Sequence, residues 1–173
     1  MYNTLLQGAD PALMIECLNG YRLKEKLPSN LLDFFVPLGV PEVIREGEDI
    51  TLVSYGATLR IVEEAAEALE GSGISCEIVD VQTLLPFDVH HKILDSLKKT
   101  SRIVFVDEDV PGGAAGYMFN KVMEEQGGYK WLDTAPRTIT AKAHRPAYAS
   151  DGDYFSKPNA EEIMDVVRDM MRE

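Results

Sequence analysis

The chain contains little cysteine, little tryptophan and few basic residues. Its 173 residues include two cysteines, one tryptophan and three histidines, and 17 Lys and Arg against 29 Asp and Glu give a net charge of -12. Cys17 and Cys76 lie in or beside apolar runs, so we expect them to be buried free thiols, which suit the reducing environment of a cytoplasmic protein. The scarcity of basic residues disfavours nucleic acid as a partner, because phosphate contacts need clustered Lys and Arg.

Other signals are missing as well. No apolar run approaches the roughly 20 residues of a membrane span, and no signal peptide is recognisable, so we expect no membrane partner. Cys, His, Asp and Glu show no zinc-type spacing, so no metal site is expected.

Apolar runs alternating with helical patterns indicate an α/β fold. Five strands are expected, at residues 43–45, 50–55, 76–80, 103–107 and 138–141. Strands rich in Val and Ile, separated by helices of ten to fifteen residues, are typical of βαβ units. We therefore predict a three-layer α/β/α domain with a five-stranded, mostly parallel sheet. Four residues separate the first two strands, so the first should be antiparallel and lie at an edge.

Four helices are expected in the same region. Thr58 should act as the N-cap of a helix over 58–70, which buries Val62, Ala65, Ala66 and Leu69. A second helix covers 90–99 with Asp88 as its cap, a third covers about 113–126, and a long loop covers 142–158. Asn159 should cap the last helix, with Glu162 at the third position of a capping box.

The first forty residues have a different character. Residues 12–17 are strand-like, and residues 18–41 carry the Pro and Gly punctuation of a linker. We expect residues 1–17 to be a remnant of a preceding domain, residues 18–41 to be a linker, and residues 42–173 to form the α/β domain.

Two short segments are candidate loop sites. Gly112, Gly113 and Gly116 lie where a strand passes into a helix, a place where backbone amides can hold an anion. The alternative, which we favour, is that they permit a tight turn, because Glu108 and Asp109 would repel phosphate. His144 and Arg145 lie in the long loop, and long loops are often functional, although a lone histidine is more often a surface residue.

Three segments together resemble one family. Residues 36–56 (VPLGVPEVIREGEDITLVSYG) resemble the entry to the transketolase C-terminal domain, and more narrowly that of the β subunit of thiamine-dependent 2-oxo acid dehydrogenases. Residues 80–88 (DVQTLLPFD) are similar to the family segment D-x-R-T-L-x-P-x-D, with Gln82 where arginine is usual. Residues 106–116 (VDEDVPGGAAG) resemble H-E-x-x-x-x-G-G-x-G, with Asp107 where histidine is common. Residues 12–16 with Tyr21 and Arg22 look like the last strand of the preceding pyrimidine-binding domain and its exit.

The resemblance implies an accessory domain of an enzyme. The family decarboxylates a 2-oxo acid on thiamine diphosphate and Mg, then passes the acyl group to a lipoyl arm. The domains that hold this cofactor are missing beyond a possible last strand, so no catalytic, cofactor-binding or metal-binding residue is carried onto this chain, and the fragment alone should be inactive. The branched-chain 2-oxoisovalerate type is preferred over the pyruvate type.

The resemblance also implies partners: a second copy of the chain, the dihydrolipoyl acyltransferase and the α subunit or α half of the enzyme. Acidic residues on or near the last helix are candidates for docking a basic acyltransferase domain, although a charged helix face is usually only solvated. They are Asp133, Glu161, Glu162, Asp165, Asp169 and Glu173. A different class of function remains open, an autonomous small-ligand or nucleotide-binding α/β module.

Overall fold

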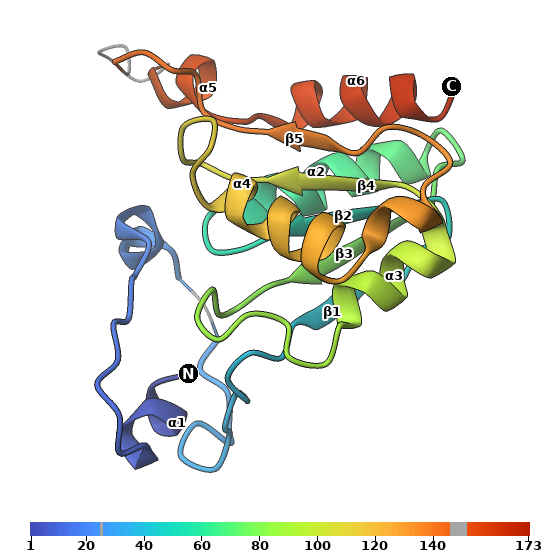
Figure 1. Cartoon of the computed structure of the whole chain (residues 1–173). Coiled ribbons are helices and arrows are strands. Elements are labelled where there is room, and N and C mark those ends of the chain that lie inside the picture. Colours follow the sequence, from blue (N-terminus) through green and yellow to red (C-terminus); the bar gives the residue numbers. More distant parts are fainter. Residues whose placement is uncertain (25, 146–151) are drawn as a thin grey trace.

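The computed structural model describes residues 1–24, 26–145 and 152–173 and shows the three-layer architecture (Figure 1). The strands are β1 (Glu42–Arg45), β2 (Ile50–Ser54), β3 (Cys76–Asp80), β4 (Ile103–Val106) and β5 (Arg137–Ile139), in the order β1-β3-β2-β4-β5. Helices α2 (Thr58–Glu70) and α6 (Ala160–Met170) cover one face, and α3 (Lys92–Thr100) and α4 (Ala114–Phe119) cover the other. The predicted fold class is confirmed.

The first strand is antiparallel and lies at an edge, but its neighbour is β3 and not β2. The connection between β1 and β2 crosses the start of β3, where the amides of Glu48 and Asp49 both donate to the carbonyl of Ser75. Gly47 lies so close to β3 that an added Cβ would be 2.2 Å from the backbone of Cys76. The short connection therefore bridges a third strand instead of closing a hairpin. The last residues expected in three of the strands, Tyr55, Asp107 and Thr140–Ala141, lie beyond the strand ends.

Alternate side chains of the strands build two cores. Toward α2 and α6 the sheet contributes residues such as Leu52, Ile78 and Val104, which pack against Val62, Ala65, Ala66 and Leu69 of α2. Toward α3 and α4 it contributes Val53, Val79 and Phe105. The helical spacing of apolar residues at 62, 65, 66 and 69 therefore identified the buried face of α2 correctly.

The predicted N-cap at Thr58 is wrong. Ala57 precedes the helix and Thr58 is its first residue. The Thr58 hydroxyl donates to the carbonyl of Tyr55 at 2.7 Å, so it stabilises the turn after β2 instead of accepting a helix amide. At α6 the prediction holds, because Asn159 Oδ1 accepts the amide of Glu162 at 2.8 Å. The Glu162 carboxylate does not complete a capping box and instead bonds Lys142.

The second and third helices differ from prediction at their ends. Helix α3 begins at Lys92 and not at residue 90, and the buried Asp88 carboxylate accepts the amides of Lys92 and Ile93 from outside the helix. The third helix is α4 followed by a π-helical turn, η2 (Asn120–Glu125), and a 3₁₀ turn, η3 (Gly128–Trp131). The loop predicted over 142–158 contains a short helix, α5 (Gly152–Ser156), and its residues 146–151 lie outside the described part of the chain.

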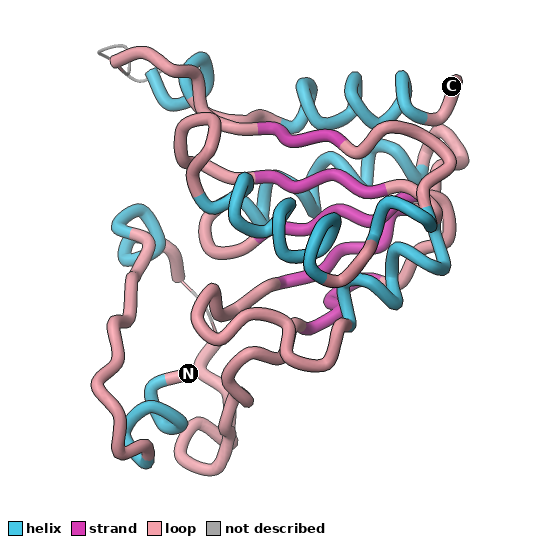
Figure 2. Tube along the Cα trace, viewed as in Figure 1, coloured by secondary structure: helices cyan, strands magenta, loops and turns pink. Residues whose placement is uncertain are grey.

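Residues before 37 form an arm beside the domain, drawn in blue in Figure 1 and mostly as loop in Figure 2. It contains α1 (Tyr2–Gln7) and the 3₁₀ turn η1 (Leu18–Arg22). Residues 12–17, expected to be strand-like, form no strand and pair with no strand of the sheet described. Large apolar side chains such as Leu13 and Ile15 stand exposed along the arm. In the parts of the chain that the structure covers, no helix is long and apolar enough to cross a membrane.

Candidate functional site

The sheet reverses its winding between β2 and β4. From β2 the chain adds β3 on one side, then crosses back to add β4 on the other. In open α/β sheets, ligands bind at the carboxyl ends of the strands beside such a switch point. Gly56 follows β2 and Glu108 follows β4, so these residues mark the position where a site is expected.

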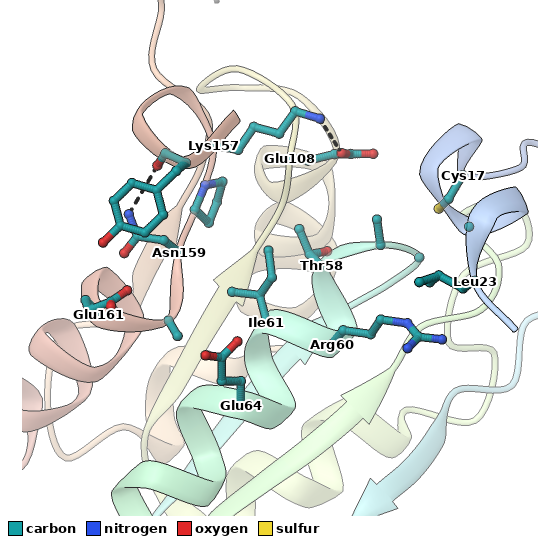
Figure 3. A pocket seen from close by; sticks show the side chains of 16 residues that line it. Cys17, Leu23, Thr58, Arg60, Ile61, Glu64, Glu108, Lys157, Asn159 and Glu161 are labelled. Atoms are coloured by element: carbon teal, nitrogen blue, oxygen red, sulfur yellow. Dashed lines mark hydrogen bonds and ion pairs between the residues drawn. The ribbon is translucent and has the colours of Figure 1, made fainter. Parts of the chain in front are cut away.

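A pocket of about 570 Å³ opens at this position (Figure 3). Its walls come from the arm, the start of α2, the loop after β4 and the connection from α5 to α6. The lining residues are Cys17, Gly20, Leu23, Gly56, Ala57, Thr58, Arg60, Ile61, Glu64, Glu108, Tyr154, Lys157, Pro158, Asn159, Ala160 and Glu161. The volume lies within the range of small-molecule pockets, about 300–1,000 Å³.

Charges of both signs surround the pocket. Lys157 Nζ lies 3.1 Å from the Glu108 carboxylate, so this pair is largely neutralised. Arg60 points toward the arm near Leu23, and Glu64 follows one turn later on α2 (Figure 3). Carboxylates therefore stand among the lysine and arginine side chains, an arrangement that favours a mixed or weakly charged ligand over a polyanion.

A buried carboxylate, Asp107, directly precedes the pocket residue Glu108 in the chain. Asp107, with no exposed surface, accepts the Tyr55 hydroxyl at 2.7 Å, the Asp109 amide at 3.2 Å and the Ala115 amide at 2.8 Å. Burial, then the hydrogen bond to Asp107 and the neighbouring carboxylates, raises the pKa of Tyr55 well above its ordinary value. Because Asp107 joins the ends of β2 and β4 to the start of α4, its role here is to fix the loops around the pocket.

The glycine-rich turn agrees with the tight-turn interpretation. Gly112 has a φ of +89°, a backbone conformation that glycine adopts readily, and a Cβ on Gly113 would lie 2.3 Å from the Asp109 carboxylate. The Ala115 amide in the first turn of α4 already bonds to Asp107. A carboxylate of the chain itself thus takes the place of an external anion. Gly116 has open space where a Cβ would lie, so nothing in the described chain requires a glycine there.

His144 and Arg145 lie apart from the pocket lining. Both are exposed, and His144 Nδ1 lies 2.8 Å from the Arg145 carbonyl. Their local hydrogen bond matches the surface-residue alternative for the histidine.

Most of the acidic candidates on and near α6 are paired with basic side chains. Five of them have a basic neighbour within 4.0 Å, and the pairs are Asp133–Arg102, Glu162–Lys142, Asp165–Arg168, Asp169–Arg172 and Glu173–Arg137. Glu161 instead lines the pocket. Exposed ion pairs of this kind are weak, about 0–1 kcal/mol each, so a basic partner could exchange with them, but the steering charge is smaller than the sequence indicates.

The pocket does not fit a magnesium-bound diphosphate. Its lining mixes the carboxylates of Glu64, Glu108 and Glu161 with Arg60 and Lys157, and the described residues contain no group of three His, Cys, Asp or Glu able to hold a metal ion.

Comparison with protein families identifies the family to which the chain belongs. The family described as "Transketolase, C-terminal domain" matches residues 39–163, and the chain belongs to this family.

Several of its relatives carry the names of dehydrogenase subunits. The chain is 32% identical over 164 residues to a pyruvate dehydrogenase E1 component subunit beta of Rhizobium meliloti, covering 94% of this chain and 35% of that protein. It is 39% identical over 110 residues to a 2-oxoisovalerate dehydrogenase subunit beta of Bacillus subtilis, covering 63% of this chain and 33% of that protein. The chain thus spans about a third of the length of these two relatives.

A solved structure supports the fold. An inactive β4 tetramer of a split-gene transketolase matches with a TM-score of 0.65 and 24% identity, covering 82% of this chain and 44% of that one. At this identity the likeness shows the fold alone.

The position of the pocket could be predicted from the sequence only in part. The pocket lies at the carboxyl ends of the strands, the general binding position of α/β folds, but none of the candidate loop residues lines it. Arg60, Tyr154 and Lys157 were not recognised, because helix spacing alone does not show that α2 and the α5–α6 connection meet at one edge.

Proposed function

We propose that this chain is the accessory C-terminal domain of the first component of a 2-oxo acid dehydrogenase complex. In this proposal it belongs to the β subunit, or the β half of a fused enzyme, in the cytoplasm, paired with the α subunit or α half. The complete component carries out oxidative decarboxylation and acyl transfer to lipoyl. The proposal rests chiefly on the family match over residues 39–163 together with relatives named as dehydrogenase β subunits.

The domain's role in this proposal is structural. It serves subunit dimerisation and docking of the acyltransferase, while thiamine diphosphate and magnesium are held elsewhere in the enzyme. The exposed apolar side chains of residues 12–17 support the assignment of residues 1–17 to a preceding domain, with residues 18–41 as linker. Calorimetry of this chain with thiamine diphosphate and magnesium should give no binding heat, and micromolar binding would contradict the assignment.

The proposed substrate is a branched-chain 2-oxo acid. The 39% identity to the 2-oxoisovalerate subunit favours it, although the pyruvate relative matches at 32% over a longer stretch. A test is to complete the enzyme with its cofactor-binding domains and compare kcat/KM for 2-oxoisovalerate and pyruvate. A higher value for pyruvate would reverse the preference.

Docking is tested with the isolated basic docking domain of the acyltransferase. We expect Asp133→Lys/Asp169→Lys to weaken its affinity by about tenfold at low salt, and by less at higher salt, because charge attraction is screened. Glu63→Lys/Glu67→Lys is the matched control, since it makes the same charge change on the exposed side of α2. Equal affinity for wild type and both variants would remove the α6 surface from consideration.

Dimerisation is tested by sedimentation equilibrium of the whole chain. We expect a mass near twice 19.2 kDa at micromolar concentration. A single species of monomer mass over the whole concentration range would contradict this part of the proposal.

The pocket favours a second candidate, an α/β module that binds a small ligand. A cavity of about 570 Å³ at the switch point is the specific observation behind it. Thermal-shift screening against nucleotides and small metabolites separates the two, because a ligand at a hundred times its Kd stabilises by about 2.7 kcal/mol. A specific hit that Ile61→Trp abolishes would favour this module.

A further inference from the structure

An exposed tryptophan lies between two lysines at the end of the sheet opposite the pocket. Trp131 in η3 is 40% exposed, and Tyr129 of the same turn is 53% exposed. The ammonium nitrogens of Lys98 and Lys130 lie 5.7 and 5.6 Å from the centroid of the Trp131 ring. We name Lys98, Tyr129, Lys130 and Trp131 the aromatic–lysine patch. It joins the end of α3 to the turn after η2, and these segments are in contact (Figure 1).

The patch is attached firmly to the core. The Tyr129 ring packs edge-on against the Phe119 ring, with 6.2 Å between the ring centroids. Phe119 in turn packs against the fully buried Phe105 of β4, with 5.9 Å between the ring centroids. A Cβ on Gly128 would lie 2.7 Å from the side chain of Met123, so the turn sits closely on η2. A surface held in this way loses little conformational freedom when a partner binds.

The patch also places two lysines, Lys98 and Lys130, on the surface of an acidic chain. Residues 92–102 contain four of the chain's 17 Lys and Arg but only one of its 29 Asp and Glu. Lys99 is engaged with Glu46 and Glu77. Lys98 has only the exposed pair with Asp95, and Lys130 has no carboxylate within 4.0 Å in the described parts of the chain. Lys98 and Lys130 can therefore offer their charge to a partner.

We propose that the aromatic–lysine patch docks an acidic polypeptide segment of a partner protein. Apolar side chains of that segment cover Trp131 and Tyr129, and its carboxylates pair with Lys98 and Lys130. Tryptophan and tyrosine carry much of the binding energy of protein interfaces, and complementary charge guides the encounter. Stacked nucleic-acid bases would also suit the rings, but the net charge of -12 opposes a phosphate backbone.

The chain carries its own probe for this contact. Trp131 is the only tryptophan, so intrinsic fluorescence reports on the patch alone. A synthetic peptide of alternating Glu and Leu, without aromatic residues, is titrated into the whole chain. We expect a saturable blue shift whose apparent Kd rises about tenfold from low to high salt. A peptide with Lys in place of Glu should give no shift. An unchanged spectrum up to the solubility limit of the acidic peptide would overturn the proposal.

Variants separate the patch from general charge effects. The anisotropy of a dye-labelled acidic peptide is measured, so that variants without Trp131 can be compared. We expect Lys98→Glu/Lys130→Glu and Trp131→Leu each to weaken binding by about tenfold. Lys24→Glu/Lys26→Glu makes the same charge change on exposed positions of the arm and should leave the affinity within about twofold. Circular dichroism confirms the fold of each variant.

Two further outcomes would overturn the proposal. One is an equal loss of affinity in the arm control. The other is tighter binding of a single-stranded oligonucleotide than of the peptide, lost in the same patch variants, which would assign the patch to nucleic acid. The docking test on α6 substitutes Asp133 and Asp169 and no residue of the patch.

Discussion

Replacing the Asp107 carboxylate tests how the loops around the pocket are held. The carboxylate is fully buried and accepts three hydrogen bonds, from the Tyr55 hydroxyl and from the amides of Asp109 and Ala115. Asp107→Ala leaves the buried Ala115 amide without an acceptor, at about 1–3 kcal/mol. Losing the partner of the half-buried Tyr55 costs about 0.5–1.5 kcal/mol more, while the Asp109 amide can turn to water.

Repulsion from the neighbouring Glu108 and Asp109 is relieved in the variant, which offsets a few tenths of a kcal/mol. The net expectation is about 2–4 kcal/mol of lost unfolding free energy. For a domain of this size that is a fall in Tm of about 5–15 °C. Asp107→Asn keeps one acceptor oxygen and should lose about half as much.

The assay is urea denaturation followed by circular dichroism and by Trp131 fluorescence. Asp165→Ala is the matched control, because its side chain is 78% exposed and its carboxylate lies 3.8 Å from Arg168 in an exposed ion pair; we expect a change below about 0.5 kcal/mol. If Asp107→Ala unfolds at the same urea concentration as wild type, the carboxylate does not hold these loops.

Three further changes test other parts of the structure. Leu69→Asp should destabilise the domain by about 3–5 kcal/mol, because it places an unpaired charge in the core. Glu67→Lys, on the exposed side of α2, should change Tm little. Equal Tm values for the two variants would show that the assigned buried face of α2 is wrong. Burial raises the pKa of the Cys76 thiol to about 12, so iodoacetamide at pH 8 should label only the half-exposed Cys17 in the folded chain, and mass spectrometry locates the label. Because the pKa of Tyr55 is raised in the folded state, the folded protein holds this proton at pH values where the unfolded chain has lost it. Its contribution to the free energy of unfolding is therefore complete below pH 10 and declines as the pH rises above 10. Tyr55→Phe should flatten this decline when urea titrations are repeated at several pH values.

Local patterns in the sequence were enough to predict most of the helices and strands. The apolar spacing of α2 predicted both the helix and its buried face correctly, and the Val- and Ile-rich runs predicted β2, β3 and β4 as strands. Both signals depend only on neighbours within a few residues. The same holds for the cap of α6, because Asn159 bonds an amide three residues later. The Thr58 cap failed because a hydroxyl can equally donate to a turn, and spacing does not distinguish the two roles.

Contacts between distant segments needed the folded chain. The neighbour of β1 is set by how the β1–β2 connection packs on Ser75, which a count of connecting residues cannot show. The sequence did not show that Lys142 and Arg137 form ion pairs with Glu162 and Glu173 on α6 and beside it. The pocket and the aromatic–lysine patch likewise bring together residues far apart in the chain. Such contacts depend on how whole elements pack across the sheet, and that packing leaves no periodic trace in any one segment.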